Sequence, residues 1–253
     1  MLIQPPMVID AVLTQVNSDL LVTTHEAPGM VGTSPIGMLF ANGSGVFWTL
    51  TFILVIVHGF REQRPMIPTV AILLNVSWEI LAVFHWPAYN TQMKYGSIAW
   101  LTVDVVIVYQ LLRYGAAHQR FAEIRKHWRL TVLSGLLLAL VGHEFFSLYN
   151  ADEFGLEDSF LINLIMSVLF IRMYFEYRDT SKLARWIAWS KMLGTAMASV
   201  GLTLIMASMP TPPPRSPLFL YYLMVACFLF DTLYVGLLVK ARGTAPTGAA
   251  VPA

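Results

Sequence analysis

Long apolar segments constrain this chain more than any other feature of its sequence. A segment of about 20 mostly apolar residues can cross a bilayer, and it does so as a helix because every backbone polar group must then be satisfied internally. We therefore predict an all-α integral membrane bundle of seven transmembrane helices. The predicted spans are Met38–Phe60, Met66–Trp86, Gly96–Tyr114, Arg129–Tyr149, Asp158–Tyr177, Leu183–Met209 and Pro217–Val239.

Charged residues are scarce and balanced. They make up 12% of the 253 residues, whereas a soluble domain carries about 25%. This composition excludes a soluble enzyme. The net charge of +1 offers no surface for a polyanion, so nucleic acid is not an expected partner. The single cysteine, Cys227, excludes disulfides within the chain.

The segments outside the spans suggest three parts. Residues 38–239 form the predicted seven-helix domain, residues 1–37 an N-terminal tail and residues 240–253 a disordered C-terminal tail. Within the first tail, Met7–Val22 has helical spacing and fits either an interfacial helix or a loosely packed segment.

The basic residues are distributed unevenly between the two sides of the predicted bundle. Thirteen of the 16 follow the first, third, fifth and seventh spans or flank them on the same side, while the opposite side holds only Lys94 and Arg215. The positive-inside rule then predicts an outside N-terminus and a cytoplasmic C-terminus.

Several ionisable side chains fall inside the predicted spans. Such groups are expensive in a membrane and are candidates for function by default. The acids outnumber the one deep base, so some must be protonated, hydrogen-bonded or next to water. These ionisable residues are Glu79, Asp104, Glu144, Lys191 and Asp231.

Glu79 is the leading candidate for a general acid. Asn75 precedes it by four residues and shares its helix face, and Trp78 flanks it. An amide can hold one carboxyl oxygen, and desolvation keeps the proton on the other, which makes a strong acid. The alternative is a polar clamp between helices.

Asp231 is the only ionisable group deep in the last span. Glu79 and Asp231 lie on antiparallel spans, each within one helical turn of the membrane midplane. The two carboxyls can therefore face the two ends of one elongated apolar ligand. An interhelical hydrogen bond is an equally good explanation of Asp231 alone.

The remaining polar candidates have weaker signals. Asp104 and Glu144 fit supporting roles around the acids, although the sequence favours a structural role for each. We expect Lys191 to extend toward the membrane surface, as long basic side chains often do. Asn163 and Ser167 share one helix face, a pattern typical of interhelical packing. Both are also candidates for the pocket, where Asn163 and Asp104 would hold the polar network.

Aromatic side chains deep in the spans could line a dry pocket. Aromatic faces stabilise cations when desolvated, so an acid in such a pocket suits carbocation chemistry. The candidates are Trp78, Phe84, Phe170, Tyr174, Phe228, Phe230 and Tyr234.

Familiar motifs for other chemistries are missing from the sequence. It contains no DDxxD or DxDD aspartate cluster, no HExxH and no GxSxG. The last span has no lysine before Lys240 for a retinal Schiff base. We therefore expect no metal site and no cofactor.

The polar residues of the spans resemble a known family. The Asn75-x-x-Trp78-Glu79 motif, Asp104, the Asn163–Ser167 stretch and Asp231 are similar to the membrane-bound, seven-helix terpene cyclases of meroterpenoid biosynthesis, of the pyripyropene-cyclase type. The resemblance implies that Glu79 and Asp231 are the essential acids. The low-complexity C-terminal tail suggests a bacterial member, located in the plasma membrane.

The mechanism implied by this resemblance is a metal-independent class II cyclisation. An acid protonates a terminal alkene or epoxide of a linear prenyl chain attached to an aromatic group or indole, and internal alkenes attack the resulting cations in turn. A small transporter and a non-catalytic receptor or assembly factor remain the alternatives. The substrate's identity, the stereochemistry and the oligomeric state stay open.

Overall fold

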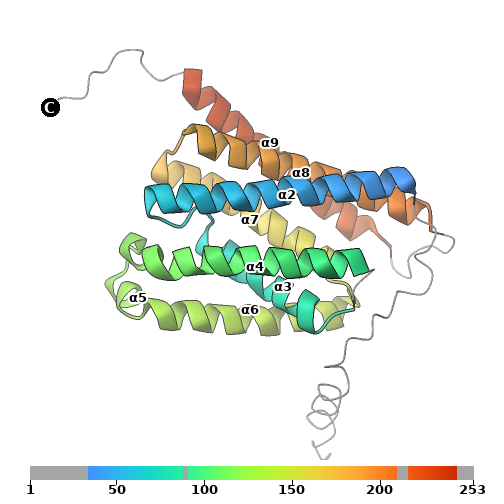
Figure 1. Ribbon diagram of the computed structural model, residues 1–253, viewed down its shortest axis with the longest axis horizontal. Coiled ribbons are helices and arrows are strands. Elements are labelled where there is room, and N and C mark those ends of the chain that lie inside the picture. Colours follow the sequence, from blue (N-terminus) through green and yellow to red (C-terminus); the bar gives the residue numbers. More distant parts are fainter. Residues whose placement is uncertain (1–33, 88–90, 210–215, 244–253) are drawn as a thin grey trace, which may run out of the picture.

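The computed structural model describes residues 34–87, 91–209 and 216–243, and this part of the chain is helical with short connections. Each of the seven predicted spans corresponds to one long helix, which confirms the all-helical prediction (Figure 1). The helices are α2 (Pro35–Glu62), α3 (Thr69–Phe84), α4 (Thr91–Tyr114), α6 (Trp128–Asn150), α7 (Leu156–Tyr177), α8 (Lys182–Ala207) and α9 (Leu218–Gly243), with the short η1 (Gly115–His118) and α5 (Ala122–Lys126) between α4 and α6.

The helix α3 is shorter than the predicted span Met66–Trp86. It begins only after Pro68, and its 16 residues extend about 24 Å at 1.5 Å per residue. The hydrocarbon core of a bilayer is about 30 Å thick. The other six long helices are long and apolar enough to cross it. The shortest of the seven long helices therefore carries Glu79.

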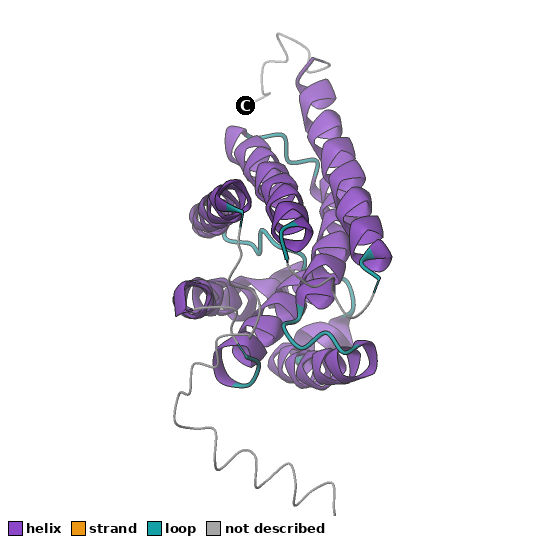
Figure 2. Cartoon of the chain, turned by 90° about the vertical axis from the view of Figure 1, so that its right-hand side faces the viewer, coloured by secondary structure: helices purple, strands orange, loops and turns teal. Residues whose placement is uncertain are grey.

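The long helices form two groups that meet in the middle of the bundle. In one group α2 packs along α8, and α9 contacts both α7 and α8; in the other, α3 packs between α4 and α6. Contacts between α3 and α7 and between α2 and α4 join the groups. Figure 2 views this arrangement from one end.

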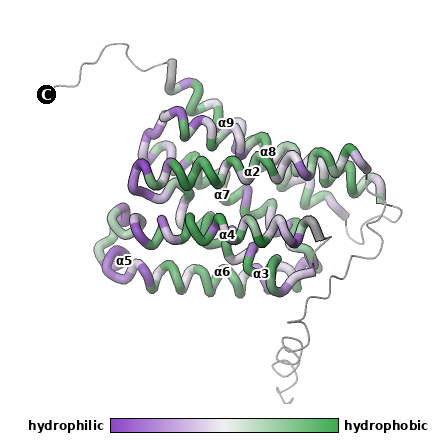
Figure 3. Tube along the Cα trace, viewed as in Figure 1, coloured by the Kyte–Doolittle hydropathy of each residue, from purple (hydrophilic) through white to green (hydrophobic). Residues whose placement is uncertain are grey.

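Hydropathy follows the helix axes. Hydrophobic residues dominate the middle of the helices and hydrophilic residues gather at the ends, most visibly around α5 (Figure 3). Large apolar side chains such as Leu138, Phe145 and Val225 are exposed, as expected for a surface that faces lipid.

The two ends of the bundle differ in charge. We call the end with α5 and the C-terminus of α9 the basic end, and the opposite end, with the loop at 151–155, the acidic end. The helix α2 begins at Pro35, and α9 continues to Gly243. The predictions for residues 1–33 and 244–253 lie outside the described residues.

Candidate functional site

Two buried carboxyl groups lie between α3 and α4. Glu79 is 4% exposed and Asp104 is fully buried. The Asn75 amide that we expected beside Glu79 instead donates to Asp104 Oδ2 at 2.7 Å. The Glu79 carboxyl receives a hydrogen bond from Ser97 of α4. We call Glu79 and Asp104 the acid pair.

The acid pair has unused hydrogen-bonding capacity. Glu79 Oε2 and Asp104 Oδ1 are buried and lack a hydrogen-bond partner among the described residues. Two carboxylates without a nearby cation cannot both stay ionised at low cost in an apolar interior. The environment therefore favours a proton on at least one of them.

A second polar group lies among α7, α8 and α9. Lys191 Nζ donates to Asn163 Oδ1 at 2.7 Å, to Ser167 Oγ at 2.7 Å and to Asp231 Oδ1 at 2.6 Å. Asn163 Nδ2 in turn donates to Thr195 Oγ1 at 2.9 Å. We call Lys191, Asn163, Ser167 and Asp231 the lysine cluster.

The expectation that Lys191 reaches the membrane surface is wrong. The residue is 1% exposed, because three oxygen atoms inside the bundle satisfy all three of its N–H donors. Asn163 and Ser167 each accept a hydrogen bond from this ammonium group. Asp231 Oδ2 is buried and has no hydrogen-bond partner within the described chain.

Aromatic rings line the bundle next to the lysine cluster. Phe170 and Tyr234 are buried with ring centroids 5.5 Å apart, and Tyr174 follows on the same face of α7. On the other side of the lysine, the Trp48 ring centroid lies 5.5 Å from Nζ. Three of the predicted pocket aromatics, Phe170, Tyr174 and Tyr234, are therefore buried, and Tyr234 follows Asp231 by about one helical turn.

Other predicted pocket aromatics are exposed, which contradicts that assignment. Phe228 is 44% exposed, and Phe84 and Phe230 also lie on the surface. The buried stripe of α9 includes Cys227, Asp231 and the positions a turn further on, and Phe228 lies beside this stripe. These side chains face the lipid rather than a pocket.

Glu144 and Trp78 make contacts away from the acid pair. Glu144 Oε1 lies 3.2 Å from His85 Nε2, and its Oε2 accepts from Trp86 Nε1 at 3.3 Å. Trp78 donates through Nε1 to the Gly155 carbonyl at 2.9 Å. Both residues thus tie α3 and the following turn to the region around α6 and the start of α7.

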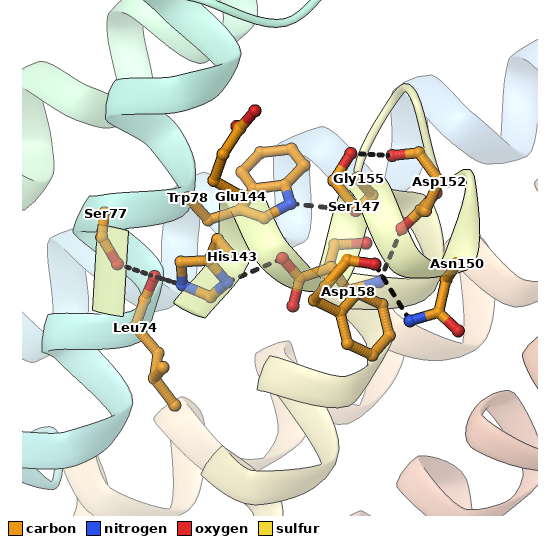
Figure 4. A network of polar contacts seen from close by, with 12 residues as sticks. Leu74, Ser77, Trp78, His143, Glu144, Ser147, Asn150, Asp152, Gly155 and Asp158 are labelled. Atoms are coloured by element: carbon orange, nitrogen blue, oxygen red, sulfur yellow. Dashed lines mark hydrogen bonds and ion pairs between the residues drawn. The ribbon is translucent and has the colours of Figure 1, made fainter. Parts of the chain in front are cut away.

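The acidic end contains a further buried network (Figure 4). His143 Nδ1 lies 2.6 Å from Asp158 Oδ2, and its Nε2 lies 3.0 Å from the Leu74 carbonyl oxygen. Asp152 accepts from the backbone N–H groups of Leu156 and Asp158. Burial raises the pKa of Asp152 above its usual value, although these N–H groups oppose the rise.

A comparable network closes the basic end. Asp179 Oδ2 lies 2.7 Å from both His58 Nε2 and Arg64 Nη2, and Oδ1 accepts from the Ser181 N–H. Burial alone would raise the pKa of Asp179, but the hydrogen bonds from His58 and Ser181 outweigh it and hold the pKa below its usual value. A cavity of about 10 Å³ beside Arg64 and Tyr177 has room for one water.

Sequence reasoning missed the network around Lys191. Thr195 and Trp48 were not among the candidates, and Lys191 itself was assigned to the surface. A signal was present, because Lys191 and Thr195 are four residues apart on one helix face, as are Asn163 and Ser167. Only the side-chain hydrogen bonds between α8 and α7 in the folded bundle show that these two faces meet.

The fold and the buried groups define a class of protein. The molecule is an integral membrane helix bundle with a buried acid pair, a buried lysine–aspartate pair and buried aromatic rings. No group of three His, Cys, Asp or Glu residues in the described ranges lies close enough to hold a metal ion. These features are those of a membrane protein with an acid-containing interior.

The family match agrees with that class. The family of Pyr4-like transmembrane terpene cyclases matches residues 23–244, which include all seven long helices. The chain belongs to this family.

Named relatives come from fungi. Terpene cyclase macJ of Penicillium terrestre is 25% identical over 63% of this chain and 64% of its own length. Terpene cyclase ascF of Acremonium egyptiacum is 28% identical over 45% and 42%, and the Pyr4-family terpene cyclase mfmH of Annulohypoxylon moriforme is 24% identical over 62% and 66%. The matches thus cover between about two fifths and two thirds of these relatives.

Two further results come from the comparisons. No solved structure matches the chain. The relatives are fungal, so the comparisons do not support the bacterial origin, and with it the bacterial plasma membrane, that the C-terminal tail suggested. What they do support is an integral membrane protein of the Pyr4-like family.

Proposed function

We propose that the chain is a class II terpene cyclase that converts a linear prenyl chain, carried by an aromatic group or indole, into a polycyclic meroterpenoid. The acid pair is the observation that carries this proposal. A buried carboxyl with one unpartnered oxygen and a second carboxyl nearby is built to hold a proton in an apolar site and to deliver it. Membership of the cyclase family and the names of the relatives support the same activity.

The proposed reaction begins with a proton transfer and involves no oxidation or reduction. Glu79 gives its proton to the terminal alkene or epoxide oxygen of the substrate, and a tertiary cation forms at the adjacent carbon. Internal alkenes attack in turn, each forming a carbon–carbon bond and moving the cation along the chain. Loss of a proton to a base, or capture by an internal nucleophile, ends the cascade.

The other residues of the site have supporting roles in this proposal. Asn75 binds Asp104 and so fixes the carboxyl next to Glu79. Phe170, Tyr174 and Tyr234 are buried on the helices that carry Ser167 and Asp231, and in this proposal their ring faces stabilise cationic intermediates by about 1–2 kcal/mol each. Asp231 is the second essential acid, serving either as a donor or as the group that relays or removes a proton.

The proposed setting is a lipid bilayer with the basic end in the cytoplasm. The positive-inside rule supports this orientation, since the basic residues gather at that end. A reporter fused to the C-terminus tests it, and a reporter signal from the opposite side of the membrane would reverse the orientation.

The experiment that tests the function measures products formed by membranes containing the protein. Farnesylated and geranylgeranylated aromatics and their terminal epoxides are the substrates. Glu79→Gln and Asp231→Asn should each lower cyclisation by about 10²–10⁴-fold, the usual contribution of a positioned acid or base. Glu62→Gln is the matched control, because Glu62 lies exposed at the end of α2.

The same experiment separates the competing functions. Full activity in Glu79→Gln would refute the catalytic role of Glu79. If no substrate in the series is cyclised, but reconstituted protein moves solutes into liposomes, the chain is a transporter and the proposed function fails.

A further inference from the structure

Lys191 is a buried basic residue with no role in the mechanism proposed above. Its Nζ is surrounded by Asn163 Oδ1, Ser167 Oγ and Asp231 Oδ1 at 2.6–2.7 Å. An ammonium group has three donors and no acceptor, so these three oxygens match its hydrogen-bonding capacity.

The neighbouring hydrogen bonds fix the direction of each contact. The Ser167 hydroxyl donates to the Asn163 carbonyl at 2.8 Å, so its oxygen faces Nζ as an acceptor. Asn163 Nδ2 donates to Thr195, which leaves the amide oxygen for Lys191. Each of these two groups therefore turns a negative dipole end toward Nζ.

Aromatic packing adds to this preference for a positive charge. The Trp48 ring centroid lies 5.5 Å from Nζ, within the range of a cation–π contact. Lys191 and Asp231 could also exist as a neutral amine and acid. The two oxygen dipoles and the indole ring all favour the ammonium form, which leaves Asp231 as a carboxylate.

We propose that Lys191 is a positioning residue that holds Asp231 ionised, so that Asp231 Oδ2 is the proton acceptor that ends the cation cascade. This inference rests on the proposed cyclase function and assigns a different role to each of the two essential acids. Glu79 donates the first proton, and Asp231 removes the last. Asp231 Oδ2 is suited to that role, since it is buried and has no hydrogen-bond partner among the described residues.

The proposed step conserves protons and electrons. The final carbocation loses a proton from the carbon next to the charge, the electrons of that C–H bond form the product alkene, and Asp231 becomes a neutral acid. Glu79 is then a carboxylate. Proton exchange with water after product release restores both groups, so the overall reaction is an isomerisation.

The first experiment compares products and turnover in a double-mutant cycle. Lys191→Met and Asp231→Asn should each lower turnover at least about 100-fold and raise the share of hydroxylated products, because water captures a cation that is not deprotonated. Since Lys191 acts through Asp231, the double variant should lose no more than Asp231→Asn alone. Lys182→Met is the control, because Lys182 is an exposed lysine on the same helix.

The second experiment measures the charge of Asp231 without any substrate. Infrared spectroscopy separates the stretch of a carboxylate from that of a carboxylic acid. The difference between the unmodified protein and Asp231→Asn should show loss of a carboxylate. If Asp231→Asn does not fold, the double variant Lys191→Met/Asp231→Asn takes its place, because it removes both members of the ion pair. The difference between the spectra of the unmodified protein and this double variant should again show loss of a carboxylate.

The outcomes distinguish this inference from the proposed function. A protonated carboxyl in the difference spectrum overturns the inference, as do Lys191→Met membranes that match Lys182→Met in turnover and products. A multiplicative loss in the double variant also overturns it. If the unmodified protein cyclises no substrate, the proposed function fails, while the infrared result still decides the charge of Asp231.

Discussion

The contact between Asn75 and Asp104 can be tested by removing its donor. Leucine has nearly the shape of asparagine, so Asn75→Leu deletes the 2.7 Å hydrogen bond to Asp104 Oδ2 with little change in packing. Asp104 is fully buried, and its other oxygen has no partner in the described chain. The variant thus leaves both oxygens of a buried carboxyl without a hydrogen bond.

The expected cost follows from this geometry. Leaving a buried acceptor unsatisfied costs about 1–3 kcal/mol. For a chain of this size each kcal/mol lowers the midpoint of thermal unfolding by about 2–4 °C. A loss of about 2 kcal/mol therefore corresponds to a decrease of about 4–8 °C.

The single cysteine supplies the assay. Cys227 is the only cysteine and is fully buried, so a dye that fluoresces on reaction with a thiol reports unfolding as the temperature rises. In the variants Asn75→Leu, Asp104→Leu and the double Asn75→Leu/Asp104→Leu, the double should be less destabilised than the sum of the singles by at least about 1 kcal/mol. Additive effects within about 0.5 kcal/mol would refute the contact.

Two further predictions concern stability. Gly201→Ala should destabilise the bundle by about 1–3 kcal/mol, because its Cβ would lie 2.8 Å from Ala41 N and 2.9 Å from Gly37 O; Gly236→Ala, whose Cβ meets nothing within 4 Å, should be neutral or stabilising in the same thermal assay. Asp179→Asn should cost about 2 kcal/mol at neutral pH, since hydrogen bonds to a charged group are lost. The pKa of Asp179 is lowered in the fold, so its contribution to stability is present above about pH 4 and is lost as the pH falls further. The midpoint of thermal unfolding of Asp179→Asn should therefore fall less on acidification than that of the unmodified protein. The same pH dependence in both proteins would contradict this prediction.

Much of the fold could be predicted because the bilayer restricts the possible structures. A run of apolar residues has to become a helix there, so all seven ranges fell on helices and differed mainly at their ends. The largest difference is at α3, where Pro68 delays the helix to Thr69. Proline has no N–H to donate and is disfavoured inside a helix, so Pro68 stands just before the first residue of α3.

The site was predictable one residue at a time but not as a set of contacts. Glu79, Asp104 and Asp231 are buried as their cost in a membrane implies. Which helix faces meet is decided by tertiary packing, and no spacing within one helix reveals it. For that reason the sequence predicted a contact between Asn75 and Glu79, and the contact between Lys191 and Asp231 was not predicted.

The exposure of aromatic residues was unpredictable for a related reason. In water an exposed phenylalanine is costly, so an aromatic deep in a span would be assigned to the interior. In a membrane the lipid outside a helix is as apolar as the protein interior, so Phe228 can lie exposed on the outer surface without a hydrophobic cost. Polar residues therefore mark the interior of a membrane bundle better than apolar ones do.

The two buried carboxyl sites suit opposite tasks because their surroundings differ. Glu79 has the carboxyl of Asp104 as its charged neighbour within the described part of the chain, which favours its neutral form, whereas Asp231 is bound to an ammonium group. In the proposed cycle a turnover reverses this state: the proton rests on Asp231, Lys191 loses its counter-ion and Glu79 becomes charged. Separated charges in a medium of low dielectric are costly, so the interior itself favours the return of a proton to Glu79 before the next substrate binds.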